Sequence, residues 1–235
     1  IHLVGIISEF GRVTYERLHV EATRNLVAIA QTEGVRRFVH MSALGTRPDA
    51  VSRYHRTKWA AEEIVRESGL NFTIFRPSLI YGPEDHFVNQ FARLARWLPF
   101  LPVMGDGRSL MQPVAVEAVA RCFVGALTQR ASVGQTFDLC GPERLSFEEI
   151  LDVILAATGR KRRKLHVPMP VARGQALLLE LFFGRFLHKP PPLNRDQLIM
   201  LQEDNVGDPS AMERVFRIKQ DSFASGIAKY LRRGS

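Results

Sequence analysis

The chain has 235 residues, of which 46% are hydrophobic and 24% are charged, proportions typical of a folded protein with a packed core. We predict neither a membrane-spanning helix nor a signal peptide, because the sequence contains no uncharged apolar run of about 18 residues and no basic segment before an early apolar run. The two cysteines, Cys122 and Cys140, exclude a disulfide framework and have no metal ligands beside them, which indicates a reducing compartment. The net charge of +8 is compatible with a nucleotide, anionic lipid or acidic partner, whereas nucleic-acid binding is not expected without a recognition module.

Strand-like and helical segments alternate in the first third of the chain. Residues 1–5 predict a buried parallel strand, and residues 14–32 predict a helix. Residues 37–42 predict a second strand, residues 51–68 a second helix and residues 71–76 a third strand. On the first helix, Leu18, Ala22, Leu26 and Ile29 recur at helical spacing, with Val20 and Val27 beside them. Strand, helix and strand in this order form a βαβ unit, which builds parallel sheets that bind ligands at the carboxyl ends of their strands.

The remaining two thirds of the chain are predicted to be mainly helical. The expected helices cover residues 87–98, 116–128, 147–158, 171–187 and 223–231, with short helices opened by Asn194 and by Asp208-Pro209. The expected extended segments cover residues 110–114, 136–139 and 164–167, and residues 99–107 are expected to break the preceding helix and turn. Two capping boxes, Ser146 with Glu149 and Asn194 with Gln197, mark helix starts.

Two segments of the second half have more than one interpretation. The basic run at residues 160–164 follows a helix, where cations are favourable, but it could also contact a 2′-phosphate, lipid or protein. The apolar helix at residues 171–187 fits the core of a small domain. It also fits a helix that covers an apolar substrate tail, or one that docks on a membrane or membrane-protein surface.

Tyr54 and Lys58 are the candidate chemical groups of the predicted second helix. Residues at i and i+4 lie on one face of a helix, so a phenol and an ammonium can point at the same substrate. An ammonium about 4 Å away favours the phenolate, which predicts that Lys58 lowers the pKa of Tyr54 toward neutrality, where acid–base groups work best. Taken alone, this spacing also fits a surface helix with an incidental Tyr and Lys.

Three features in the right order resemble the short-chain dehydrogenase/reductase superfamily, and in particular its extended and atypical, epimerase-like branch. They are a strand followed by Ser42, the pair Tyr54-x-x-x-Lys58, and the run Arg-Pro-Ser-Leu-Ile-Tyr-Gly-Pro at residues 76–83. Nearly the whole chain also resembles the branch that contains the accessory subunit of respiratory complex I and its bacterial relatives. The most specific part of that resemblance is residues 76–91.

The resemblance implies a bound dinucleotide, NADP or NAD, and assigns residues to it. Tyr54 would be the acid–base group, Lys58 would tune its pKa and bind the nicotinamide ribose, and Ser42 would complete the catalytic set. The residues that it places against the cofactor are Leu3, Val4, Gly5, Met41, Ser42, Tyr54, Lys58, Pro77, Ser78, Leu79 and Ile80. It implies no metal.

The fold implied by the resemblance is α/β, with a Rossmann-type doubly wound parallel sheet and a smaller, mostly helical C-terminal substrate domain. Residues 1–83 would form the C-terminal part of the NAD(P)-binding domain, and residues 110–141 would return to it. Residues 84–109 and 142–235 would form the smaller substrate or interaction domain. The sequence lacks the glycine-rich phosphate loop and the residue that selects NAD or NADP, so we expect it to be a fragment without the first part of the Rossmann domain.

Three positions depart from the family pattern. His19 replaces an asparagine at the start of the first helix, and Ala118 stands where an acidic residue is usual. The catalytic hydroxyl usually lies one or two residues after Ser42, where this chain has Ala43 and Leu44. Ser42 would then contact only the cofactor, which weakens the expectation of ordinary reductase chemistry.

Two functions follow from the resemblance. The first is an NAD(P)-dependent oxidoreductase or epimerase/dehydratase that acts on a small-molecule or lipid-like substrate. The alternative is a non-catalytic NAD(P)H-binding accessory or assembly module of a respiratory NADH:quinone oxidoreductase or another membrane complex. A third interpretation is a regulatory relative that binds no NAD(P).

The expected surroundings follow from the same resemblance. We expect a cytoplasmic protein, with association to the cytoplasmic or matrix side of a membrane or to a respiratory complex as a further expectation. A homodimer through the helices at residues 14–32 and 51–68 is also compatible with the family.

Overall fold

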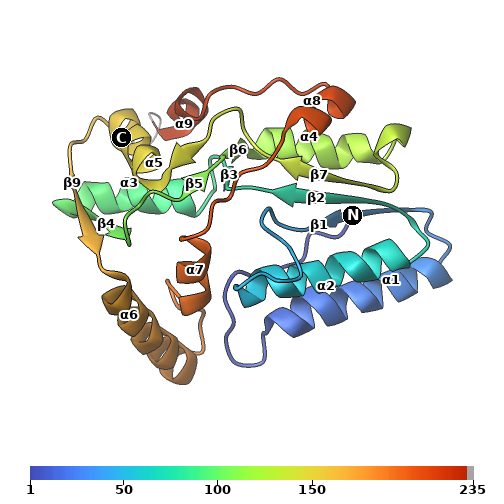
Figure 1. Cartoon of the computed structure of the whole chain (residues 1–235), viewed down its shortest axis with the longest axis horizontal. Coiled ribbons are helices and arrows are strands. Elements are labelled where there is room, and N and C mark those ends of the chain that lie inside the picture. Colours follow the sequence, from blue (N-terminus) through green and yellow to red (C-terminus); the bar gives the residue numbers. More distant parts are fainter. Residues whose placement is uncertain (232–235) are drawn as a thin grey trace.

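Three parallel strands form the centre of the molecule. The structure is a computed structural model that describes residues 1–231, so residues 232–235, assigned above to the smaller domain, lie outside the described residues. The strands are β1 (Arg37–Met41), β2 (Asn71–Pro77) and β7 (Gln135–Leu139), and they pair in the order β1-β2-β7 (Figure 1). This arrangement confirms the predicted α/β fold with a parallel sheet.

Helices cover both faces of this sheet. One face carries the π-helical turn η1 (Glu16–Glu21), α1 (Ala22–Thr32) and α2 (Arg53–Glu67), and the other carries α4 (Val116–Ala126) and α8 (Ser210–Phe216) (Figure 1). Successive side chains of a strand point to opposite faces, so each strand of this sheet needs apolar residues at consecutive positions.

The central strands show this two-sided burial directly. Phe38 and Ile74 pack with Val27 of α1 and Val65 of α2 on one face. Their neighbours Val39 and Phe75 pack with Val119, Cys122 and Phe123 of α4 on the other. The pairing places Val39 opposite Thr73 and Met41 opposite Phe75, so that β1 and β2 end side by side.

A second layer of structure forms beside the central sheet. It contains α3 (Phe87–Trp97), β4 (Phe100–Met104), α5 (Phe147–Ala157), β9 (Arg163–Val167) and α9 (Phe223–Leu231). Strands β4 and β9 pair in parallel, and the buried side chains of α3, α5 and α9 share one core cluster. The predicted capping box at Ser146 is confirmed, because its hydroxyl accepts a hydrogen bond from Glu149 N at the start of α5.

Short elements connect these parts. β3 (Ile80–Tyr81) pairs with β6 (Val114–Ala115), β5 (Leu110–Met111) pairs with β8 (Leu145–Ser146), and η2 (Arg130–Ser132) precedes β7. The chain then runs through α6 (Met169–Phe182), the π-helical turn η3 (Phe183–Leu187) and α7 (Arg195–Met200). The second predicted capping box, at Asn194, is also confirmed. Within residues 1–231, every helix is too short or too polar to cross a bilayer.

Several local expectations were wrong. Residues 1–5 make only one isolated bridge, from His2 to His40, and Leu3 and Val4 remain half exposed because only one side of this segment has a partner among residues 1–231. Residues 99–107 were expected to form a turn, but they contain the strand β4. The turn residues follow at the end of this strand.

The first helix buries a different face from the one on which Leu26 and Ile29 recur. Its buried residues are His19, Val20, Thr23, Val27 and Ala30, whereas Leu26 and Ile29 are exposed. The small side chains of Thr23 and Ala30 allow the helix to approach the sheet closely. The spacing of the large apolar residues alone does not predict this.

Glu62 is fully buried in α2. Its carboxylate binds Arg66 one turn later, and it also binds Arg76 of β2 at 2.7 and 2.8 Å. Burial is tolerated because two guanidinium groups pair with this single carboxylate.

Candidate functional site

Lys58 lies buried where β1 ends. Its Nζ donates a hydrogen bond to the carbonyl oxygen of Met41, the last residue of β1, at 3.0 Å. The same Nζ approaches Gly5 so closely that a Cβ at Gly5 would lie only 2.9 Å from it. The amine therefore sits between two adjacent chain segments at the carboxyl edge of the sheet, the edge where α/β proteins bind ligands.

Tyr54 lies one helical turn before Lys58, at the start of α2. Ser52 caps this helix by accepting a hydrogen bond from His55 N at 3.3 Å. The phenol ring is half buried and meets the rings of Tyr15, His19 and His55 edge-on, with centroids 5.3 to 5.9 Å apart. Edge-on aromatic contacts on several sides fix the direction of this ring.

The protonation of the pair differs from the expectation. Burial raises the pKa of Tyr54 to about 12, and burial also lowers the pKa of Lys58 to about 8. The predicted lowering of the Tyr54 pKa by Lys58 is therefore not seen, because the ammonium is directed at the Met41 carbonyl and desolvation disfavours both charged forms. At neutral pH the site holds a neutral phenol beside a cationic amine.

His19 takes a structural place in this network. Its Nδ1 lies 2.9 Å from Thr57 Oγ1, and its Nε2 lies 3.1 Å from both the nitrogen and the oxygen of Ile6. Burial, followed by the charge of Lys58, lowers its pKa to about 3, so the ring is neutral. His19 thereby links α2 to the segment that carries Gly5.

The hydroxyl of Ser42 points inward. Ser42 is buried, its Oγ lies 3.4 Å from Thr46 Oγ1, and its backbone nitrogen donates to Phe75 O at 2.7 Å. Ala43 and Leu44, which follow it, are also buried. The backbone of this loop runs beside the end of β2, where the Leu44 N–H donates to Pro77 O at 2.9 Å.

Ser78, in the loop after β2, is used to hold the C-terminal part of the chain. Its hydroxyl donates to Asn205 at 2.6 Å and accepts from Gln112 N at 3.3 Å. Asn205 in turn donates through Nδ2 to Leu44 O at 3.0 Å. One asparagine thus ties together the loops that follow β1 and β2, which places Met41, Ser42, Pro77 and Ser78 at one edge.

Residues 194–205 also contact the start of the Tyr54 helix, which sequence analysis missed. Asp196 accepts hydrogen bonds from Arg53 N, Tyr54 N and Ser52 Oγ at 2.8 to 3.0 Å. Asn194 donates to Ile7 O at 3.2 Å. The capping box at Asn194 was the available signal, but it marks only a helix start and not the partner of that helix.

The remaining candidate residues fit a dinucleotide at this edge. Leu3 and Val4 are about half exposed, at 54% and 50%. Leu79 follows Ser78 in the loop, and Ile80 begins β3. Gly5 leaves room for close approach to the backbone, and Lys58 offers a cation and hydrogen-bond donors for ribose hydroxyls. A cavity of about 770 Å³ lies elsewhere, beside Tyr81, Arg121 and Tyr230.

The parallel sheet, with helices on both faces and this edge at the ends of its strands, is that of a Rossmann-type domain. A family model described as NAD(P)H-binding matches residues 6–92. UDP-glucuronic acid 4-epimerase from Bacillus cereus, solved with UDP-glucuronic acid and NAD, has a TM-score of 0.71 over 99% of this chain and 74% of its own. Its sequence identity is 18%. That likeness shows a shared fold.

Proteins that are similar in sequence have higher identity to this chain than the structural neighbour has. Subunit 9 of the alpha subcomplex of mitochondrial NADH dehydrogenase (ubiquinone) from Arabidopsis thaliana is 29% identical over 91% of this chain and 54% of its own length. Sterol demethylase protein B from Methylococcus capsulatus is 28% identical over 92% of this chain and 73% of its own. The chain spans about half the length of the mitochondrial relatives it matches. The predicted resemblance to the epimerase-like branch and to complex I subunit 9 homologues is confirmed.

Proposed function

We propose that this protein binds NAD(P)H across the carboxyl edge of β1 and β2 and uses Tyr54 as a proton donor to a substrate carbonyl. The main support is the position of Lys58, whose amine lies between the Met41 carbonyl and Gly5 at the ligand-binding edge of a parallel sheet. Lys58 binds the ribose hydroxyls in this proposal, and the backbones of residues 3–5 and 77–80 line the dinucleotide.

When bound, the dinucleotide supplies a hydride to the substrate. The part of the chain in this chemistry is to position the substrate and to move one proton. A Tyr54 phenol with a pKa near 12 keeps its proton at neutral pH, so it is suited to donate that proton to an oxygen that gains negative charge. Reduction is therefore the favoured direction in this proposal.

The substrate in this proposal is a small or lipid-like carbonyl compound. A sterol-related name among the relatives, and the apolar α6 helix beside the smaller core, support the lipid-like class. Nucleotide sugars are the comparison class, because UDP-glucuronic acid is bound by a structural neighbour of the same fold.

One observation favours a second function, a non-catalytic NAD(P)H-binding module of a respiratory NADH dehydrogenase, on the cytoplasmic or matrix side of the membrane. The hydroxyl of Ser42 is buried against Thr46, and the next two residues, Ala43 and Leu44, have no hydroxyl. Residues 42–44 therefore offer no exposed hydroxyl that could orient a substrate carbonyl. The curated relatives named as NADH dehydrogenase subunits support the same alternative.

Purified protein should first be denatured and the released dinucleotide identified. Turnover is then measured with NADH and NADPH on ketone, aldehyde and nucleotide-sugar substrates, for the unchanged protein and for Tyr54→Phe. We expect Tyr54→Phe to lower turnover about 100-fold or more while the dinucleotide stays bound. Tyr230→Phe is the matched control, because it removes a hydroxyl of α9 that is hydrogen-bonded to Asp85, and it should leave turnover unchanged.

The outcomes separate the two functions. A retained dinucleotide without turnover on any substrate supports the accessory module. Turnover that survives Tyr54→Phe excludes Tyr54 as the proton donor. A protein that neither retains nor binds a dinucleotide contradicts both functions.

A further inference from the structure

The α6–η3 segment, residues 169–187, packs against the rest of the molecule along only one face. Its buried residues are the small Ala172 and Ala176, which contact Leu198 of α7. Figure 1 shows α6 projecting at the lower left, away from the layers of the central sheet. The other faces of this helix are therefore free of contacts with residues 1–231.

The free faces of the segment are strongly apolar. The exposed large apolar residues are Val171, Leu177, Leu178, Leu181, Phe182, Phe186 and Leu187. Val171, Leu178 and Phe182 recur at helical spacing and form a stripe, and Leu178 and Phe186 are 68% and 70% exposed. A contiguous apolar surface of this kind marks an interaction site on a folded protein.

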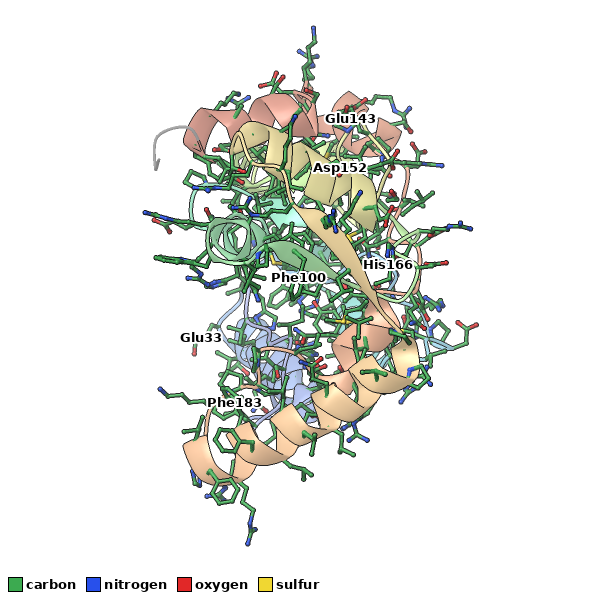
Figure 2. All side chains as sticks on the ribbon, turned by 90° about the vertical axis from the view of Figure 1, so that its left-hand side faces the viewer. Glu33, Phe100, Glu143, Asp152, His166 and Phe183 are labelled. Atoms are coloured by element: carbon green, nitrogen blue, oxygen red, sulfur yellow. The ribbon has the colours of Figure 1, made fainter. Side chains whose placement is uncertain are left out.

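Basic residues outnumber acidic ones in this segment and in the strand before it, although Lys164 of that strand is paired with Asp152 at 2.8 Å. The basic residues between positions 160 and 189 are Arg160, Lys161, Arg162, Arg163, Lys164, Arg173, Arg185 and Lys189, whereas Glu180 is the one acidic residue. The Glu180 carboxylate is already paired with Arg195 at 2.9 Å. Figure 2 shows β9, which carries His166, running directly into α6 on the same side of the molecule.

We propose that the α6–η3 segment lies in the headgroup region of a membrane that carries anionic lipids. The apolar stripe would enter the boundary of the acyl chains, and Arg173, Arg185 and Lys189 would contact lipid phosphates. The inference does not depend on the chemistry at Tyr54, because it requires only a folded α6.

Two features favour a lipid surface over a second copy of the chain. Two copies that met through this stripe would bring Arg173, Arg185 and Lys189 of both copies together, which is unfavourable. The one carboxylate of the segment, Glu180, is already paired with Arg195. The segment also projects from the molecule (Figure 1), so it can reach a flat surface without a complementary groove. Negative lipid headgroups supply the charge that the segment lacks.

The test measures sedimentation of the purified protein with two kinds of vesicle. One is phosphatidylcholine alone, and the other is phosphatidylcholine with about one third phosphatidylglycerol. We expect binding to the anionic vesicles at low salt, weaker binding at high salt, and little binding to phosphatidylcholine alone, because surface electrostatics are screened by salt.

Three variants locate the contact. Leu178→Glu and Phe186→Glu should each lower the partition coefficient about tenfold or more, and Arg185→Glu should lower it mainly at low salt. Val124→Glu is the matched control, because Val124 is a 66% exposed apolar residue on α4, far from α6 in Figure 1. It should bind vesicles like the unchanged protein. All four positions are on the surface, and thermal unfolding checks that each variant is folded.

The proposal is overturned if the unchanged protein binds neither vesicle, or if Leu178→Glu and Val124→Glu bind equally well. It is also overturned if size-exclusion chromatography shows a dimer that Leu178→Glu dissociates while vesicles bind none of the proteins. Retention of dinucleotide, measured on the same variants, should not change, so failure here leaves the proposed function untouched.

Discussion

The carboxylate of Asp196 accepts a hydrogen bond from the backbone nitrogen of Tyr54 at 2.9 Å, although 142 residues separate the two in sequence. Its second oxygen accepts from Arg53 N at 2.8 Å, so one side chain of α7 satisfies two free N–H groups at the start of α2. A negative charge at a helix N-terminus is also favoured by the helix dipole. The direction of the Tyr54 helix is therefore fixed by the C-terminal part of the chain.

Replacing Asp196 with Ala should destabilise the protein and loosen the start of α2. We expect the free energy of unfolding to fall by about 1–2 kcal/mol, as for the loss of other helix caps. Chemical denaturation measures this loss, and hydrogen exchange at the amides of Arg53 and Tyr54 should become faster.

Asp49→Ala serves as the control for Asp196, because Asp49 is exposed and, among residues 1–231, its carboxylate forms an ion pair only with Arg47 at 3.6 Å. It should change the free energy of unfolding by less than about 0.5 kcal/mol. Equal losses for the two variants would show that Asp196 does not act as a cap.

Affinity for the dinucleotide should depend on pH through Lys58. Burial lowers the pKa of Lys58 to about 8, so the amine is a cation below this pH and becomes neutral above it. If the cation binds the ribose, the dissociation constant should be flat below pH 8 and rise about tenfold per pH unit above it. Isothermal titration calorimetry from pH 6 to about 10 measures the profile.

Lys58→Met should bind weakly and without this pH dependence, whereas Lys161→Met, at an exposed position, should keep the profile of the unchanged protein. An unchanged profile in Lys58→Met would assign the pH dependence to another group.

Three buried histidines should make the protein sensitive to acid. Burial lowers the pKa of His2 to about 4 and that of His19 to about 3, and it lowers the pKa of His40 well below its usual value. The unfolded chain takes up protons near pH 6.5 while the folded protein does not, so stability is complete above pH 6.5 and falls as the pH decreases toward 4. Each histidine contributes a slope of about 1.4 kcal/mol per pH unit in that window.

His40 offers the clearest test of this slope, because neither of its ring nitrogens has a hydrogen-bond partner within residues 1–231. His40→Phe should make the free energy of unfolding less dependent on pH between 4 and 6.5. His86→Gln, at an exposed position, should leave the dependence as it is. Identical slopes for the two variants would contradict a role for His40.

Gly141 should tolerate no side chain, because a Cβ there would lie 1.9 Å from the carbonyl oxygen of Pro113. We expect Gly141→Ala to lower the free energy of unfolding by about 1–3 kcal/mol, since a backbone atom cannot move aside like a side chain. Gly174→Ala in α6, where a Cβ meets nothing within 4 Å, should instead stabilise the helix by up to about 1 kcal/mol. Thermal unfolding of both variants checks the opposite signs.

The sequence by itself determined the features that depend on neighbouring residues. The order of strand, helix and strand, the one-turn spacing of Tyr54 and Lys58, and the capping boxes at Ser146 and Asn194 were all predictable. Each is encoded within a few residues, through side-chain periodicity or through a side chain that binds a nearby backbone group.

Tertiary structure alone decided which groups meet and how they are charged. It buried Val27 rather than Leu26 on α1, enclosed Glu62 between two arginines, and placed Asp196 at the start of the Tyr54 helix. It also raised the pKa of Tyr54, whereas the spacing of Tyr54 and Lys58 had predicted a lower value. Burial and the direction of a charge depend on segments far apart in the chain, and no local pattern records them.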